Sequence, residues 1–157
     1  MTQMNVIIRP ATMSDAEVIC EFNRRLAKET ENKDLDPAIL KAGVAAVLKD
    51  SSKGRYYVAQ DGAVVGQLGV TFEWSDWRNG NFWWIQSVYV AAVARRHGVF
   101  RKLYEHLLQE ARTQPDVIGL RLYVEHDNRV AQETYKKLGM TMTGYHLMEV
   151  GLKRSPA

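Results

Sequence analysis

Hydrophobic residues follow two different periods in the middle of the 157-residue chain. Residues 82–90 form a nearly continuous apolar run with aromatic and β-branched side chains on both alternating faces, which is typical of a strand buried on both sides of a sheet. A four-residue period then begins, with Val99, Leu103 and Leu107 on one side and polar residues on the other. This change of period predicts an amphipathic helix over 99–112, directly after a buried strand.

The remaining segments predict further strands and helices on both sides of this pair. Alternating or apolar runs predict strands at 6–10, 55–60, 63–74, 117–124 and 141–150. Helical spacing predicts helices over 14–26, 37–48 and 130–138. The order predicts one α/β domain over residues 1–157, in which helices pack on a mixed, largely antiparallel sheet.

The connections carry local signals of their own. Asp61-Gly62 predicts a hairpin, and Gly66 and Gly69 each mark either a bulge or a close approach of another part of the chain to the strand. Asp36 followed by Pro37 predicts the start of the second helix. The polar segment 28–33 is expected to be a mobile linker between the first two helices.

The turn between the buried strand and the long helix reads Arg95-Arg96-His97-Gly98. The first turn of a helix has N–H groups without intrahelical acceptors and the positive end of the helix dipole, and both favour an anion. Gly98 allows the backbone to approach a ligand, and arginines add charge-assisted hydrogen bonds. The turn is therefore a candidate phosphate site, although a plain connection with solvated arginines fits the same residues.

Composition limits the classes of function. The chain is 46% hydrophobic and 25% charged, which fits one domain with a sizeable core. Its 21 basic and 18 acidic residues give a net charge of +3 without a clustered basic stripe, which argues against nucleic-acid binding and suits an anionic small molecule. The single cysteine, Cys20, excludes an internal disulfide, and the four histidines lack metal-ligand spacing, so no metal is predicted.

Neither a membrane-spanning run nor the apolar core of a signal peptide is present in this sequence. We therefore expect a cytoplasmic protein that does not bind membranes.

Two motifs together resemble the GNAT N-acetyltransferase superfamily, and the resemblance extends over nearly the whole chain. The segment Arg95-Arg96-His97-Gly98-Val99-Phe100 resembles the family's Arg/Gln-x-x-Gly-x-Gly/Ala pyrophosphate loop. Asn128 with Ala131, Tyr135 and Leu138-Gly139-Met140 resembles its Asn-x-x-Ala-x-x-x-Tyr-x-x-x-Gly helix. The resemblance implies a GNAT-like fold with a splayed sheet, acetyl-CoA as cosubstrate and an amine as acceptor.

The resemblance also implies where the cofactor would bind. The pantetheine arm would lie in the splay and pair with main-chain groups of the central strand like an added strand. The diphosphate would bind N–H groups at the helix start, and any of Arg95, Arg96 and Arg101 is a candidate for the adenosine phosphates. The implied cofactor-binding residues are Val88, Tyr89, Val90, Arg95, Arg96, Gly98, Val99, Phe100, Arg101, Asn128 and Ala131.

Phe100 departs from the family pattern, which usually has glycine or alanine at this position. Because Phe100 lies in line with Tyr104 and Leu108 on the helix, we predict that its ring turns inward while its N–H still faces the ligand.

Acetyl transfer needs a neutral amine, a donor for the developing oxyanion and an acid for the departing thiolate. By resemblance, Tyr135 is the general acid, although its spacing also suits a core aromatic residue. The N–H of Val90 is a candidate oxyanion donor. Asn128 resembles the family's CoA-contacting asparagine and equally suits a helix N-cap.

The general base is less clearly marked. Gln86 stands where many family members carry a glutamate, and an amide takes no proton at neutral pH. Glu73 on the preceding strand is the candidate in its place. An exposed strand-end charge fits Glu73 as well, and water could instead carry the amine proton to bulk solvent.

Two further groups bear on the acceptor. Glu29, Glu31 and Asp34 lie where the family usually frames the acceptor, so they suit either a cationic amine or a solvated loop. The four tryptophans could form the wall of an acceptor pocket or stack on a cation, but we expect at least Trp83 or Trp84 to pack in the sheet.

These observations predict an N-acetyltransferase that moves the acetyl group of acetyl-CoA directly to a primary amine in a ternary complex. Cys20 lies in neither motif, which argues against a covalent acetyl-enzyme. The alternative is a CoA-binding sensor of the same fold, which Phe100 and Gln86 keep open. A homodimer through the last strands is expected by resemblance, and the sequence leaves open whether the acceptor is a polyamine, aminoglycoside, amino acid, peptide N-terminus or lysine side chain.

Overall fold

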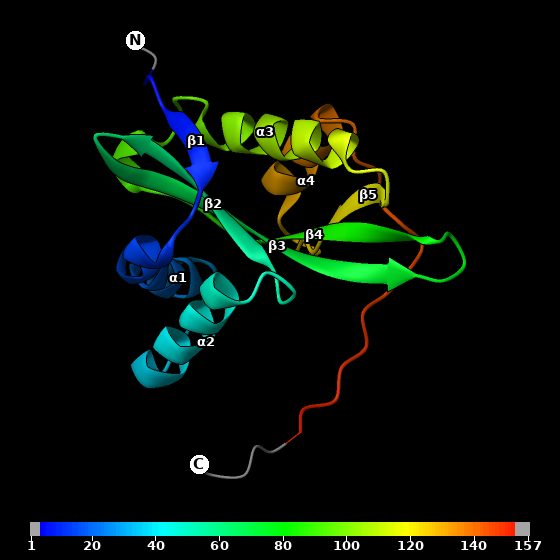
Figure 1. The fold of residues 1–157 in the computed structure, drawn as a ribbon, viewed down its shortest axis with the longest axis horizontal. Helices are drawn as coiled ribbons and strands as arrows, with labels where there is room; N and C mark the ends of the chain where they lie inside the picture. The colour runs from blue at the N-terminus through cyan, green and yellow to red at the C-terminus, as the bar shows by residue number, and fades with distance from the viewer. Residues whose placement is uncertain (1–3, 153–157) are drawn as a thin grey trace. The chain divides into compact units, whose positions relative to one another are not determined.

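The computed structural model describes residues 4–152, which divide into two compact units between Tyr123 and Val124. The first unit contains a five-stranded sheet in sequence order (Figure 1). Its strands are β1 (Ile7–Pro10), β2 (Arg55–Asp61), β3 (Ala63–Ser75), β4 (Gly80–Val90) and β5 (Val117–Leu122). Neighbouring strands from β1 to β4 are antiparallel, and β5 is parallel to β4, so the predicted mixed, largely antiparallel sheet is confirmed.

Three of the four α-helices in the described residues belong to the first unit. They are α1 (Ala16–Glu31), α2 (Pro37–Lys49) and α3 (Val99–Thr113). The start of α2 follows the predicted signal, because Asp36 Oδ1 accepts hydrogen bonds from the N–H groups of Ala38 (2.9 Å) and Ile39 (3.1 Å). No helix within residues 4–152 is both long enough and apolar enough to span a bilayer.

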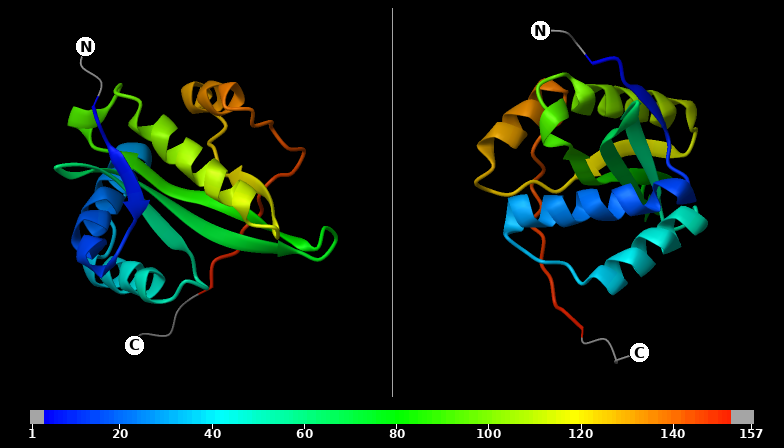
Figure 2. Two further views of the ribbon diagram at one scale, coloured as in Figure 1. Left: turned by 45° about the horizontal axis from the view of Figure 1, so that its top comes forward. Right: turned by 90° about the vertical axis from the view of Figure 1, so that its left-hand side faces the viewer.

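Adjacent residues on β2 show that α1 and α3 cover opposite faces of the sheet. The Tyr56 hydroxyl accepts a hydrogen bond from Asn23 of α1, whereas the Tyr57 hydroxyl donates to Glu110 of α3. Because neighbouring side chains on a strand point to opposite faces, the two helices must lie on different sides of β2. Figure 2 shows the same arrangement, with α1 and α2 below the sheet and α3 above it in the right-hand view.

The start of α3 lies against β3 at a glycine. A Cβ atom on Gly66 would lie only 3.0 Å from Cγ1 of Val99, the first residue of the helix. Val99 is itself 2% exposed, so it has little room to move. The predicted close approach at Gly66 is confirmed, and this contact fixes the turn before α3 beside the end of β4.

The central strand β4 contains a bulge and then loses its partner on one side. Gln86 pairs with Gly69 and Tyr89 pairs with Gln67, so two residues of β4 lie opposite one residue of β3. The pairing with β5 stops at Ile85. The splay that the family resemblance implies is therefore present, and the second half of β4 is open on the side of β5.

The prediction of a mobile linker at 28–33 is wrong. Helix α1 continues through the supposed linker to Glu31 and ends at Asn32, which adopts a left-handed conformation (φ 50°). The local polarity of 28–33 was misleading because one face of this helical end contacts β4 and the turn before α3 through Glu29.

The second unit contains α4 (Arg129–Lys137) and an irregular C-terminal segment. The predicted strand at 141–150 is wrong, since residues 140–152 form neither helix nor strand. Its apolar side chains include Tyr145, Leu147 and Met148, which are 80%, 71% and 93% exposed. Alternating hydrophobicity makes a strand possible, but a strand forms only where a second strand supplies the ladder hydrogen bonds. The prediction of a single domain stays a prediction.

Candidate functional site

The residue before helix α3 has no side chain that could accept a hydrogen bond from the first turn. Gly98 is the N-cap, with φ 75°, and the first intrahelical hydrogen bond runs from the N–H of Lys102 to the Gly98 carbonyl (3.1 Å). The N–H groups of Val99 and Arg101 therefore precede the first bond of the helix, and glycine has no side-chain oxygen to accept from them. A Cβ atom built on Gly98 meets nothing within 4 Å, so the helix start faces open space. Such a helix start suits an anion.

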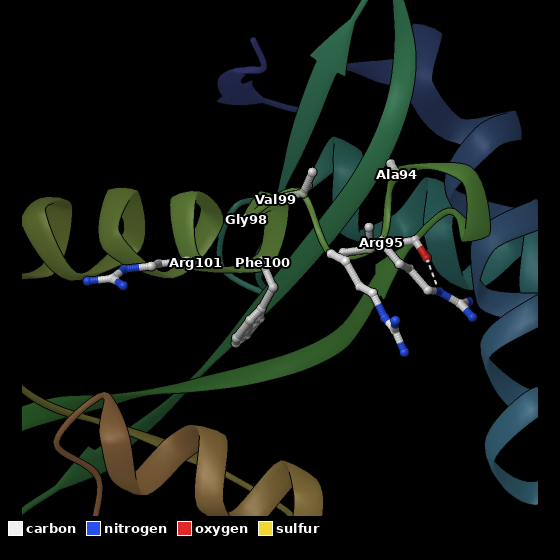
Figure 3. Close-up of a pocket in the computed structure, with 8 residues that line it drawn as sticks. Ala94, Arg95, Gly98, Val99, Phe100 and Arg101 are labelled. Carbon is white, nitrogen blue, oxygen red and sulfur yellow. Dashed lines mark hydrogen bonds between the residues drawn. The ribbon is translucent and has the colours of Figure 1, made fainter. Parts of the chain in front are cut away.

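A pocket of about 200 Å³ surrounds this turn (Figure 3). It is lined by the following residues: Val90, Ala94, Arg95, Arg96, Gly98, Val99, Phe100 and Arg101. Seven of these are residues that the resemblance assigns to cofactor binding, and Val90 connects them to the end of β4. The structure thus brings the predicted loop and the end of the central strand into one cavity.

Arg95 is held against α1 and β4. Its Nη2 lies 2.8 Å from a carboxylate oxygen of Glu29, and its Nε donates to the Val90 carbonyl at 3.0 Å, the dashed line in Figure 3. The Tyr89 hydroxyl donates to the same Glu29 carboxylate (3.0 Å), and burial together with this bond raises the pKa of Tyr89. Arg95 thus ties the turn to the C-terminal end of α1, a connection that the sequence did not reveal.

The other two arginines are in different situations. Arg101 makes an exposed ion pair with Glu105, one turn along α3 (2.9 Å). Arg96 adopts a left-handed backbone conformation with φ 66°, which costs a non-glycine residue roughly 1–3 kcal/mol. Its guanidinium makes no hydrogen bond or ion pair with any residue in the range 4–152. Arg96 is therefore the pocket arginine whose charge is most available to a ligand.

The Phe100 ring extends along α3. It stacks on the ring of Tyr104, with 6.3 Å between centroids and 22° between planes, so the predicted alignment with Tyr104 is confirmed. Figure 3 shows Phe100 and Arg101 projecting from different sides of the helix. The ring forms one wall of the pocket and leaves the Gly98 side open.

Main-chain groups of β4 divide between β3 and the open side. The N–H of Ala91 donates to the Val65 carbonyl (2.8 Å). Every second residue of an antiparallel strand directs its main-chain groups to the same neighbour, so the N–H and carbonyl of Tyr89 also face β3. Those of Val88 and Val90 then face the open side. The Val90 carbonyl already accepts a hydrogen bond from Arg95. The groups of this edge that remain for a ligand are therefore the N–H groups of Val88 and Val90 and the Val88 carbonyl.

A buried polar network lies behind the bulge, and sequence reasoning missed it. Gln67 is 0% exposed, and its Nε2 donates to Asn23 Oδ1 (2.8 Å) and to the Ser87 carbonyl (2.9 Å). Asn23 in turn donates to the Tyr56 hydroxyl (3.2 Å). One signal was available, since Gln67 interrupts the apolar residues of the strand predicted at 63–74.

The structure does not bring Glu73 to the bulge. One oxygen of Glu73 accepts hydrogen bonds from Trp84 Nε1 (2.9 Å) and from Arg121 (3.0 Å). Glu73 lies four residues beyond Gly69 on β3, which is about 13 Å along a strand. At the bulge itself, the Gln86 amide donates to the Thr71 hydroxyl (3.3 Å).

The tryptophans divide between the core and the surface. Trp83 is 4% exposed, which confirms the expected packing in the sheet, and Trp84 stacks on Tyr123 with 4.5 Å between ring centroids. Trp74 and Trp77 are 56% and 88% exposed near the β3–β4 connection.

The second unit carries the other predicted motif. Asn128 Oδ1 accepts a hydrogen bond from the N–H of Ala131 (3.1 Å), so the N-cap interpretation of Asn128 is confirmed. Tyr135 lies within α4, and burial raises the pKa of its phenol. No group of three or more potential metal ligands is found among residues 4–152.

Solved structures resemble this chain over nearly its full length. A possible acetyltransferase from Clostridium difficile 630 is 45% identical, with a TM-score of 0.90, over 95% of this chain and 99% of the other. A predicted acetyltransferase from Clostridium acetobutylicum, solved with acetyl-CoA, is 18% identical, with a TM-score of 0.76 over 93% and 96% of the two chains. Glucosamine-6-phosphate N-acetyltransferase from Arabidopsis thaliana is 18% identical, with a TM-score of 0.71 over 93% and 98%. The last two show the fold alone.

A comparison with curated proteins gives no significant match. The model of the acetyltransferase (GNAT) family matches residues 16–140, which is well over half of the chain. This match includes both sequence motifs, the bulged strand and the pocket at the start of α3. Together with the 45% identical structure, it shows that this chain belongs to the GNAT acetyltransferase family.

Proposed function

We propose that this protein is an N-acetyltransferase that transfers the acetyl group of acetyl-CoA to a primary amine by direct attack in a ternary complex. The observation that carries the proposal is that one pocket contains both the start of α3 after Gly98 and the end of the open edge of β4 at Val90. An anionic diphosphate and an extended amide-bearing arm are the two parts of CoA that these surfaces suit. Membership of the family and a relative solved with acetyl-CoA support the same cosubstrate.

The two surfaces have distinct binding roles in this proposal. The diphosphate binds the first-turn N–H groups of α3, with Arg96 as the nearest uncommitted charge, while Arg95 holds the turn. The pantetheine amides pair with the outward-facing N–H and carbonyl groups of Val88, and the Val90 N–H is left for the thioester carbonyl. Asn128 and Ala131 contribute by family resemblance. Acetyl-CoA supplies the activated acetyl group.

The chemistry requires few protein groups. The neutral amine forms the new C–N bond as the C–S bond of the thioester breaks, and the Val90 N–H stabilises the charge on the carbonyl oxygen. By family resemblance, Tyr135 is the acid that gives its proton to the departing thiolate, and its raised pKa keeps the phenol protonated at neutral pH. The amine proton leaves through water, because Gln86 stands where many family members carry a glutamate, and its amide, hydrogen-bonded to the Thr71 hydroxyl, takes no proton at neutral pH.

The second candidate function is a CoA sensor without turnover. The observation in its favour concerns Glu73, the candidate base. Its carboxylate forms an ion pair with Arg121 and accepts a hydrogen bond from Trp84, away from the bulge. Both functions require CoA binding, and only the first releases free thiol when an amine is added.

Calorimetric titration of acetyl-CoA, CoA and dephospho-CoA tests the shared requirement. We expect micromolar binding of acetyl-CoA to the wild type and a loss of at least about 100-fold in Gly98→Trp, because the indole fills the space at the helix start. Gly62→Trp is a matched control, since Gly62 also has a left-handed φ of 70° and nothing within 4 Å of a built Cβ, but lies in the β2–β3 turn.

A screen for thiol release across primary amines then separates the two functions. Binding with amine-dependent thiol release supports the transferase, whereas binding without release for every amine class favours the sensor. An absence of binding by the wild type would overturn both.

A further inference from the structure

We propose that Gln67, together with Asn23, is a positioning residue that holds the bulge of β4 and so aims the Val88 and Val90 N–H groups at the bound acetyl-CoA. The inference rests on the proposed function. It assigns a task to a buried amide pair on the opposite side of β4 from the cofactor pocket.

The contacts of Gln67 join three elements at the bulge. Its side chain is fully buried on β3, and its two N–H groups donate to Asn23 Oδ1 on α1 (2.8 Å) and to the Ser87 carbonyl in the bulge (2.9 Å). Both partners are acceptors, so the orientation of the amide is determined by its surroundings. Asn23, 8% exposed, is fixed in turn by its hydrogen bond to the Tyr56 hydroxyl.

Ser87 is a position that needs such support. Its φ of 51° is left-handed, a conformation that a residue other than glycine keeps only when its surroundings impose it. The bulge occurs between the pairs Gly69–Gln86 and Gln67–Tyr89. Gln67 therefore both pairs with the residue after the bulge and binds the carbonyl within it.

The bulge decides which side of β4 each later residue faces. Removing one extra residue from a strand exchanges the two sides for everything that follows. Without the bulge, the main-chain groups of Val88 and Val90 would face β3, and those of Tyr89 would face the gap. The open edge presents its present set of N–H groups only while the bulge stays at Ser87.

The Gln67 side chain has one polar atom without a hydrogen-bond partner. Its Oε1 is buried and has no hydrogen-bond partner among the described residues. A leucine or methionine of similar volume would leave no such acceptor on this side chain. Packing therefore does not explain a glutamine here, whereas control of the Ser87 carbonyl does.

The test compares two ligands in Gln67→Leu. Acetyl-CoA reaches both the turn and the β4 edge, whereas adenosine 3′-phosphate 5′-diphosphate reaches only the turn. We expect acetyl-CoA binding to weaken about tenfold, as for the loss of a well-formed buried hydrogen bond, and binding of the nucleotide fragment to stay within about twofold of the wild type. Amide hydrogen exchange at 87–90 in the free protein should accelerate.

Val70→Ala is the matched control. Val70 is 1% exposed and lies on β3 like Gln67, but on the other face of the sheet. Its truncation therefore destabilises the sheet and leaves the hydrogen bonds of Gln67 and Asn23 in place. We expect Val70→Ala to leave both affinities and the exchange at 87–90 unchanged. If Gln67→Leu does not fold, Asn23→Ala serves in its place, since it removes the acceptor that fixes the Gln67 amide and should show the same split between the two ligands.

The outcomes separate this inference from the proposed function. A variant that binds acetyl-CoA as tightly as the wild type, or that weakens both ligands equally, overturns the positioning role alone. A wild type that does not bind acetyl-CoA overturns the proposed function and, with it, the cofactor-aiming role of the bulge.

Discussion

Glu73 shows how the contacts of one residue change its expected role. Its carboxylate receives hydrogen bonds from Trp84 and Arg121, so it links β3, β4 and β5 near the β3–β4 hairpin. The guanidinium of Arg121 also lies over the Phe82 ring, 3.5 Å from its centroid. These contacts give Glu73 a structural task well away from the bulge.

We expect Glu73→Gln to change kcat/KM by less than about threefold and to leave the pH profile of turnover unshifted, because the amide keeps an acceptor for Trp84 and Arg121. Loss of a true general base costs about 10²–10⁴-fold. Steady-state kinetics between pH 6 and about 9 with the best amine check this prediction. A hundredfold fall together with a shifted acid limb would make Glu73 the base after all.

Tyr135 makes a prediction about alkaline pH. Burial raises the pKa of its phenol above the ordinary value of 10.0, so the acid form persists as the pH rises and is lost only beyond that value. We expect the general-acid step to operate unchanged through the neutral range and up to pH 10.0. In Tyr135→Phe, kcat should fall about 10²-fold while the Kd for acetyl-CoA stays within about twofold.

Tyr145→Phe is the control for this variant, since Tyr145 is 80% exposed in the same unit. Full turnover by Tyr135→Phe would remove the acid role and leave Tyr135 a packing residue of α4.

At the scale of elements, the end of α1 is coupled to the turn that starts α3. Glu29, on the last turn of α1, binds both the Tyr89 hydroxyl of β4 and the Arg95 guanidinium. The helix is longer than its local polarity predicts because this end is anchored by contacts to residues about sixty positions away along the chain.

The coupling predicts a salt-dependent effect on cofactor affinity. Glu29→Gln removes one negative charge beside Arg95 in the pocket, so we expect acetyl-CoA to bind about twofold to fivefold more tightly at low salt. The gain should vanish near 1 M salt, where the screening length falls to about 3 Å. Calorimetry at both salt concentrations measures it.

Glu21→Gln is the control, since the ion pairs of Glu21 within residues 4–152 are with Arg24 and Arg25 of its own helix. Weaker binding of Glu29→Gln at both salt concentrations would mean that Glu29 acts mainly by holding the turn in place.

At the scale of the whole molecule, α3 is joined to the sheet by a buried phenol as well as by its apolar stripe. Tyr57, 2% exposed, donates to Glu110, and burial and this hydrogen bond raise its pKa to about 12. In the unfolded chain the phenol loses its proton near its ordinary value of 10.0, so between the two values the folded state holds more protons. The contribution of Tyr57 to stability is therefore complete below pH 10 and declines as the pH rises toward 12.

Denaturant unfolding of the wild type and of Tyr57→Phe across this range checks the sign. The difference in unfolding free energy between them should be largest below pH 10 and shrink toward pH 12. A difference that is constant with pH would mean that Tyr57 titrates alike in both states.

Much of the fold could be read from the sequence, because the signals concerned are local. The four-residue period of α3, the Asp36-Pro37 start of α2 and the Asp61-Gly62 hairpin each depend on residues a few positions apart. The arginine turn that ends in Gly98 is also local, and it marked the helix start that the pocket surrounds.

Only the tertiary structure decided the remaining features, since each depends on residues far apart in the sequence. The alternating pattern at 141–150 forms no strand because ladder hydrogen bonds come from another segment. The partner of Glu73 is 48 positions away, and that of Gln67 in α1 is 44 positions away. The sequence by itself determined most of the helices and strands before residue 124 and where an anion suits the chain. The bulge, its buried amide pair and the partners of Glu73 and Arg95 follow from packing between segments far apart in the sequence.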